Sequence, residues 1–225
     1  MDLQSAQKEL SLKIVYTGAP LSGKTTNLQA LHQIFENRGC GKLVTLETHN
    51  DRTLFFDLLP FSVLLPSGYR VKLKVYTVPG QVMHASTRRL VLASTDGVIF
   101  VADSQRSETT HNTGAWRAMR QHLRENGLEP NQVPTVIQFN KRDLPEIRSE
   151  EEIKKLYPTA QSVIFKAIAI RGEGVFETFY GLLEILLSRI EQRYQLQERF
   201  ALRGMDILEA VKAAHNLWIE PTHEP

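Results

Sequence analysis

The chain alternates between short apolar runs and stretches whose apolar residues lie three or four positions apart. The first pattern indicates buried strands, and the second indicates amphipathic helices. The run from Val98 to Ala102 is wholly apolar, which is typical of a strand buried on both faces of a parallel sheet. The apolar runs predict strands at 10–17, 42–47, 61–65, 69–78, 97–103, 135–139 and 162–169. The helical spacings predict helices around 28–35, 107–126, 150–157, 175–194 and 200–218.

Strands that alternate with helices predict an α/β fold with a mostly parallel central sheet and right-handed crossovers. One connection differs, because only Pro66, Ser67 and Gly68 separate the runs 61–65 and 69–78. A loop this short joins antiparallel strands, so the sheet should contain one antiparallel hairpin strand.

The alternation is complete near residue 195, and thirty residues follow it. We therefore predict two parts, an α/β domain over residues 1–195 and a C-terminal helical extension over residues 196–225. The apolar face of the helix at 200–218 could pack on the domain or bind a partner in helical fashion. We favour packing, because an exposed apolar stripe that ends in Trp218 would promote aggregation.

Composition narrows the function without defining it. The 225 residues are 42% hydrophobic and 23% charged, which is normal for a globular protein. The net charge of +2 is too small for bulk electrostatic attraction to nucleic acid or membranes. No apolar stretch approaches the roughly 18 residues of a membrane helix, and we find no export or lipid-anchor signal. With a single cysteine, Cys40, these features predict a cytoplasmic protein whose function depends on local sites.

A phosphate-binding motif lies between the first predicted strand and the first helix. Residues 18–25 match the pattern G-x-x-x-x-G-K-[ST], in which backbone N–H groups and a helix N-terminus surround phosphates. We expect Lys24 to neutralise the β- and γ-phosphates and the Thr25 hydroxyl to bind Mg²⁺. The predicted phosphate-binding residues are Gly18, Ala19, Pro20, Leu21, Ser22, Gly23, Lys24, Thr25 and Thr26.

A second motif indicates which base the nucleotide carries. Asn140, Lys141, Arg142 and Asp143 follow the strand at 135–139. The carboxylate of Asp143 can accept hydrogen bonds from the N1–H and the amino group of guanine, and adenine offers no such pair of donors. In open α/β sheets ligands bind at the carboxyl ends of the strands, so these residues predict guanine recognition there.

Together these motifs resemble the Ras-like small GTPases, and most closely the bacterial cell-polarity and gliding-motility GTPases of the MglA type. The resemblance spans roughly residues 10–194, and its fold is the P-loop NTPase fold with a Ras-like G domain that has helices on both faces of the sheet. It is carried by residues 18–26, 50–57, 77–81, 98–103, 140–145 and 174–178.

The resemblance implies roles for several loop residues. Gln81 matches the glutamine that orients the attacking water, and Arg52 matches an arginine that acts on the transition state from within the same chain. Thr53 matches the switch threonine, with its hydroxyl on Mg²⁺ and its N–H on the γ-phosphate. The Ala169 N–H should lie near the guanine carbonyl. Further nucleotide contacts are implied at Gly80, Ile168 and Ala169.

Two positions depart from the usual Ras-like pattern. Thr77 stands where most Ras-like proteins have an aspartate that steadies Mg²⁺ through water, a feature that MglA-type proteins share, and Asp57 is a candidate substitute. Pro20 stands where MglA-type loops have glycine, and proline has no N–H to offer a phosphate.

The sequence therefore favours a GTP-dependent molecular switch that binds GTP or GDP with Mg²⁺ and hydrolyses GTP at a low intrinsic rate. The resemblance implies a homodimeric regulator of the roadblock fold, like MglB, that promotes hydrolysis. It also implies a role in cell polarity or motility, with recruitment to the cell poles by partners. The alternative is a GTP-binding scaffold that hydrolyses slowly or not at all, because Pro20 and Thr77 alter the site.

Overall fold

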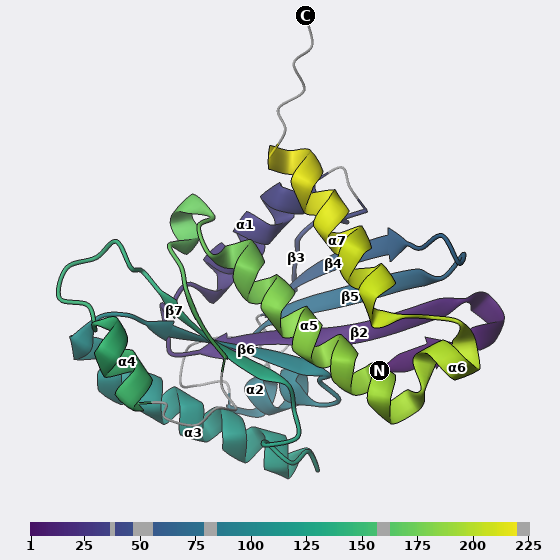
Figure 1. Ribbon diagram of the computed structural model, residues 1–225. Coiled ribbons are helices and arrows are strands. Elements are labelled where there is room, and N and C mark those ends of the chain that lie inside the picture. Colours follow the sequence, from purple (N-terminus) through teal and green to yellow (C-terminus); the bar gives the residue numbers. More distant parts are fainter. Residues whose placement is uncertain (37–38, 47–55, 79–84, 157–162, 220–225) are drawn as a thin grey trace, which may run out of the picture.

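A computed structural model describes residues 1–36, 39–46, 56–78, 85–156 and 163–219 (Figure 1). Within these residues, eight strands form one sheet in the order β3-β4-β5-β2-β6-β7-β8, and β1 pairs with β2 outside this path. The strands are β1 (Asp2–Gln4), β2 (Glu9–Gly18), β3 (Val44–Leu46), β4 (Phe56–Leu64), β5 (Arg70–Thr77), β6 (Gly97–Asp103), β7 (Thr135–Asn140) and β8 (Val163–Lys166).

The centre of the sheet is parallel, as the sequence predicts. β2 pairs in parallel with β5 and β6, and β6, β7 and β8 continue the parallel arrangement. β4 and β5 form the expected antiparallel hairpin, and β3 adds to β4 in antiparallel register. β1, which the apolar pattern did not predict, is also antiparallel to its partner.

Helices cover both faces of the sheet and bury a separate apolar cluster on each. β6 contributes to both clusters, because Ile99 and Val101 face one side while Val98 and Phe100 face the other. Residues of α1, α5 and α7 pack on the first face, and residues of α2, α3 and α4 pack on the second (Figure 1). The helices are α1 (Lys24–Phe35), α2 (Ala85–Leu92), α3 (Thr109–Glu125), α4 (Glu150–Leu156), α5 (Val175–Tyr194), α6 (Leu196–Phe200) and α7 (Gly204–Ile219).

The C-terminal residues pack on the rest of the molecule. α7 contacts α5, α1 and β4, and Leu202, Ile207 and Val211 are fully buried in the same cluster as those elements. The structure therefore agrees with the expectation that this helix packs on the domain. The side chain of Trp218 lies outside the described residues. The division of the chain at residue 195 stays a prediction, because the extension shares its core with the domain.

None of the helices within the described residues is both long and apolar enough to cross a bilayer.

Candidate functional site

The phosphate-binding motif forms the loop between the end of β2 and the start of α1. Both glycines of this loop lie so close to atoms of other segments that a side chain would not fit at either position. A Cβ on Gly18 would lie 2.1 Å from the carbonyl oxygen of Val101 in β6, and a Cβ on Gly23 would lie 2.2 Å from Nδ2 of Asn140. Gly23 also has φ 97°, in the left-handed region that favours glycine. The two glycines therefore let the loop pass close to β6 and to Asn140. α1 begins directly after the loop, so its N-terminus lies at the carboxyl edge of the sheet.

Lys24 is held inside this loop. Its side chain is 7% exposed, and its Nζ donates hydrogen bonds to the carbonyl oxygens of Ala19 at 2.6 Å and Gly18 at 3.3 Å. Burial, with a smaller contribution from the nearby Arg88 of α2, lowers the pKa of Lys24 to about 8. An anion bound beside Lys24 would raise its pKa again, so the loop is suited to bind phosphate. Pro20 and Leu21 lie on its exposed outer side.

Asn140 connects the phosphate loop to the two loops that the sequence assigned to the base. Its Nδ2 donates to the carbonyl oxygen of Ser22 at 2.9 Å, and its Oδ1 accepts from the N–H of Ala169 at 2.9 Å. The Asn140 side chain is 3% exposed, so these bonds are shielded from water. The structure thus brings residues 18–23, 140–143 and 168–169 together at the carboxyl edge of the parallel strands, where open α/β sheets bind ligands.

The Ala169 N–H has a different partner from the one that the resemblance implies. It donates to Asn140 in the structure, whereas we expected it near the guanine carbonyl. A contact with guanine would have to share this donor, so the role of Ala169 in base binding stays a prediction. Ile168 precedes it, and its N–H donates to the carbonyl oxygen of Glu173 at 2.9 Å.

A buried layer of polar side chains supports these loops from below. Gln138 in β7 is fully buried, and its Nε2 donates to Asn27 Oδ1 in α1 at 2.9 Å and to Thr178 Oγ1 in α5 at 3.0 Å. Asn27 in turn donates to the carbonyl oxygen of Gly23 at 2.9 Å. The helix behind the phosphate loop and the helix behind the base loop are therefore tied to one strand.

Lys141 pairs with an aspartate that the sequence reasoning did not single out. Lys141 Nζ lies 2.6 Å from Oδ2 of Asp103, which ends β6 and is 4% exposed. An acidic residue at the end of a wholly apolar strand is the signal that could have identified Asp103, since adjacent parallel strands end at the same edge. Asp143, two residues after Lys141, is exposed.

Three oxygen-bearing side chains meet beside the start of α1. Thr25 Oγ1 donates to Asp57 Oδ2 at 2.8 Å, and Thr77 Oγ1 donates to the same oxygen at 3.0 Å. The Asp57 N–H donates to Thr77 Oγ1 at 3.0 Å, and Asp57 is 8% exposed. A hydroxyl and a carboxylate are the kinds of ligand that Mg²⁺ prefers, so these residues fit the expected cation.

The remaining candidate residues divide into two groups. Thr26 is half-buried in the first turn of α1. The others lie outside the described residues, namely Arg52, Thr53, Gly80 and Gln81.

A phosphate loop between a parallel strand and a helix, with an Asn-Lys-x-Asp loop bound to it at the same sheet edge, defines the class of Ras-like GTP-binding proteins. The chain belongs to the ADP-ribosylation factor family, whose sequence description it matches over residues 2–186. It is 41% identical over 187 residues to the mutual gliding-motility protein MglA of Myxococcus xanthus (strain DK1622). That match covers 83% of this chain and 96% of the relative, and it confirms the resemblance to MglA-type GTPases.

Proposed function

We propose that this small GTPase is a molecular switch that binds GTP and GDP with Mg²⁺, hydrolyses GTP slowly, and signals through partners that recognise its nucleotide state. The observation that supports this most is the side chain of Asn140, which bonds both to the phosphate loop at Ser22 and to the base loop at Ala169. Because it joins the two loops, the phosphate and base ends of one nucleotide would be held by a single framework.

The proposed binding roles follow from chemistry and position. The backbone N–H groups of residues 18–25 and the ammonium of Lys24 would bind the phosphates, with Pro20 as the one position that has no N–H. The carboxylate of Asp143 would accept the two donors of guanine, and Lys141 and Asn140 would hold the loop that carries it. Replacing Asp143 by Asn should shift preference toward xanthosine nucleotides, because xanthine has a carbonyl where guanine has an amino group.

For Mg²⁺, we infer that Thr25 and Thr53 supply hydroxyl oxygens and that Asp57 supplies the carboxylate that Thr77 lacks. This assignment is supported by the 2.8 Å bond between Thr25 and Asp57 and by the burial of Asp57. Bound Mg²⁺ would neutralise charge on the phosphate oxygens. The hydroxyl of Thr77 would keep the Asp57 carboxylate in place.

For hydrolysis, we propose that Gln81 orients the attacking water and that Arg52 stabilises charge on the transferring phosphoryl group. Gln81→Leu and Arg52→Ala should each slow single-turnover release of phosphate from bound GTP while leaving the affinity for GTP nearly normal. Unchanged rates would remove these residues from the mechanism. A protein that binds ATP as tightly as GTP would contradict the proposal as a whole.

The rival function is a GTP-binding scaffold without turnover, which is supported by Pro20 in the phosphate loop. Single-turnover hydrolysis, measured alone and with the roadblock-fold homodimer of the native cell, distinguishes the two. Phosphate release that the regulator accelerates supports the switch, and no release under either condition supports the scaffold. The Pro20→Gly variant is the matched test, since it restores the missing N–H without changing other site residues.

A role in cell polarity or gliding motility is proposed by analogy with the relative whose name refers to gliding motility. Recruitment to the cell poles would then depend on partners. A pull-down from the native cell with GTP-locked and GDP-bound protein tests this, because effectors of a switch should bind only one of the two states. Equal recovery of every partner by both forms would contradict it.

A further inference from the structure

The segment that carries Asp143 connects β7 to α4 and is anchored to its neighbours through the backbone. On one side the Arg142 N–H donates to the carbonyl oxygen of Ala167 at 3.2 Å. On the other side the Arg148 N–H donates to the carbonyl oxygen of Ser104 at 2.9 Å. Asp143 itself lies between these anchors on the exposed surface. The direction of its carboxylate therefore depends on how firmly the segment is closed.

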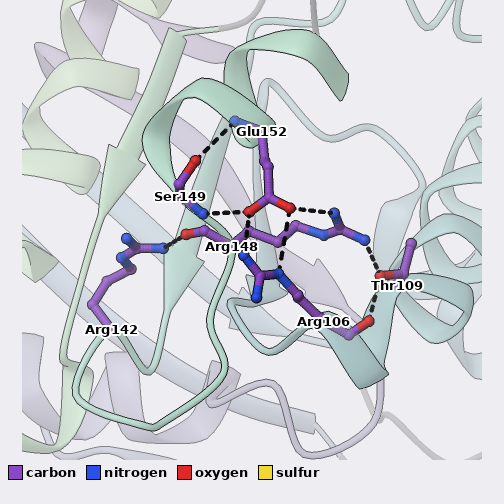
Figure 2. A network of polar contacts seen from close by, with 6 residues as sticks. All are labelled: Arg106, Thr109, Arg142, Arg148, Ser149 and Glu152. Carbon is purple, nitrogen blue, oxygen red and sulfur yellow. Dashed lines mark hydrogen bonds and ion pairs between the residues drawn. The ribbon is translucent and has the colours of Figure 1, made fainter.

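The side chain of Arg142 closes the segment directly. Its Nη1 donates to the carbonyl oxygen of Arg148 at 2.7 Å, across the base of the segment (Figure 2). Arg142 is half-buried, whereas the adjacent Asp143 is exposed, so the two consecutive side chains have different environments. A charged donor on a carbonyl oxygen is stronger than a neutral hydrogen bond. The bond fixes the distance between the two ends of the segment.

Glu152 in the first turn of α4 fixes the far end. Its Oε2 accepts from the Ser149 N–H at 2.7 Å, and its own N–H donates to Ser149 Oγ at 3.3 Å, which is a reciprocal helix cap. The same carboxylate binds the guanidinium of Arg106 through two bonds of 3.0 and 3.3 Å (Figure 2). The helix start is thereby tied to the turn that precedes α3.

Arg148 connects these two parts of the network. Its backbone carbonyl accepts the bond from Arg142, its Nη2 donates to Thr109 Oγ1 at the start of α3, and its Nη1 lies 4.0 Å from Oε1 of Glu152 (Figure 2). The side chain is largely buried, with 18% exposed. The contacts therefore connect the first turns of α3 and α4 to the segment that carries Asp143.

We propose that Arg142, Arg148 and Glu152 are positioning residues for guanine recognition, which hold the segment so that the Asp143 carboxylate is fixed at the edge of the base. This inference rests on the proposed function, in which Asp143 accepts the two guanine donors. Two parallel hydrogen bonds require both oxygens to be correctly placed, so a small displacement weakens both at once.

An isolated ion pair on the surface would not justify this role, because exposed pairs contribute little. Here the argument rests on the bond from Arg142 to the backbone of the segment itself and on the largely buried Arg148 that receives it. The Arg106 pair with Glu152 is the exposed end of the network, and we expect it to have the smaller effect.

The test compares GDP with inosine 5′-diphosphate, which lacks the amino group that Asp143 would bind. Dissociation constants are measured for wild type, Arg142→Ala, Arg142→Lys and Glu152→Gln. We expect Arg142→Ala to reduce the GDP preference on the order of tenfold. Glu152→Gln should reduce it less, and Arg142→Lys should retain most of it because lysine can still donate to the carbonyl.

Two controls separate positioning from a loss of stability. Arg203→Ala removes an exposed guanidinium outside this network, which binds both oxygens of Asp206 at the start of α7, and it should leave the preference unchanged. Asp143→Ala should abolish the preference. Melting curves identify any variant that does not fold, and in that case Arg142→Lys and Glu152→Gln carry the comparison.

The outcomes distinguish this inference from the proposed function. If wild type does not prefer GDP to inosine 5′-diphosphate, or if Asp143→Ala keeps the preference, base recognition by Asp143 is wrong. If Asp143→Ala loses the preference but the Arg142 and Glu152 variants keep it, the positioning role is wrong. Equal weakening of both nucleotides in those variants also overturns it, because such a loss indicates a structural role only.

Discussion

At the scale of single residues, Lys24 carries a charge that its surroundings disfavour. It is buried among loop carbonyls with Arg88 nearby, and its pKa is lowered to about 8. Nucleotide phosphates would supply the missing negative charge and raise the pKa again. Binding should therefore take up a proton wherever Lys24 of the free protein is partly neutral.

This coupling gives a pH dependence with a definite sign. With a pKa of about 8 before binding, GDP binding should take up about 0.5 proton at pH 8 and about 0.1 at pH 7, so affinity falls as pH rises above 8. Calorimetry in buffers with different ionisation enthalpies measures the uptake. Lys24→Arg, which stays charged, should remove the dependence, and an uptake that is equal at both pH values would contradict it.

The metal assignment is also testable at one residue. Asp57→Asn keeps the size of the side chain and its contacts with Thr25 and Thr77 but removes the negative charge. We expect the Mg²⁺ concentration needed for half-maximal retention of GDP to rise on the order of tenfold or more, because a charged oxygen binds a hard cation far better than an amide oxygen does. Thr77→Ser is the matched control, since it keeps the hydroxyl. An unchanged Mg²⁺ requirement in Asp57→Asn would contradict the role of Asp57.

Site residues that belong to one continuous motif could be identified from the sequence. Pairs of residues that only the fold brings together could not. The phosphate loop and the segment at Asp143 are continuous motifs, so spacing alone identified them. Asp103 was not identified because its partner Lys141 follows the next strand of the sheet, β7, and lies far along the chain. Asp57 was only one candidate until its bond to Thr25 placed it beside α1.

At the scale of elements, most long elements were predicted near their observed bounds, but β4 begins at Phe56, five residues before the predicted strand at 61–65. β2, β6 and α5 lie within a few residues of their predicted bounds. β1 and α6 have three and five residues, which is too short for any periodicity. The last helix begins at Gly204 rather than near Phe200, because Ala201 has φ 50° and interrupts the helical backbone.

α7 should contribute to the stability of the whole chain. Ile207 is fully buried between elements of the domain, so Ile207→Ala should lower the free energy of unfolding by about 2–5 kcal/mol. Met205 in the same helix is 60% exposed, and Met205→Ala should change it by less than about 0.5 kcal/mol. Chemical denaturation monitored by circular dichroism measures both. Equal effects of the two substitutions would show that the extension does not share the core.

At the scale of the molecule, the two helical layers and the sheet leave one edge for the nucleotide. The net charge of +2 provides no long-range attraction for a polyanion, so binding depends on the local donors at this edge. Those donors lie at the ends of β2 and β7 and in the residues after β8. Gln138 of β7 supports them from beneath, because it donates hydrogen bonds to Asn27 in α1 and to Thr178 in α5. A ligand that contacts all three should therefore stabilise the fold as a unit.

We expect GDP with Mg²⁺, at about 100 times its dissociation constant, to add about 2.7 kcal/mol to the free energy of unfolding. For a chain of this size that corresponds to a rise in melting temperature of about 5–10 °C. ATP at the same concentration should produce little shift, because adenine lacks the donors that Asp143 would accept. Asp143→Ala should lose most of the GDP shift while its melting temperature without nucleotide stays near that of wild type, since Asp143 is exposed. Equal shifts with GDP and ATP would show that stabilisation comes from the phosphates alone and that the base loop does not select guanine.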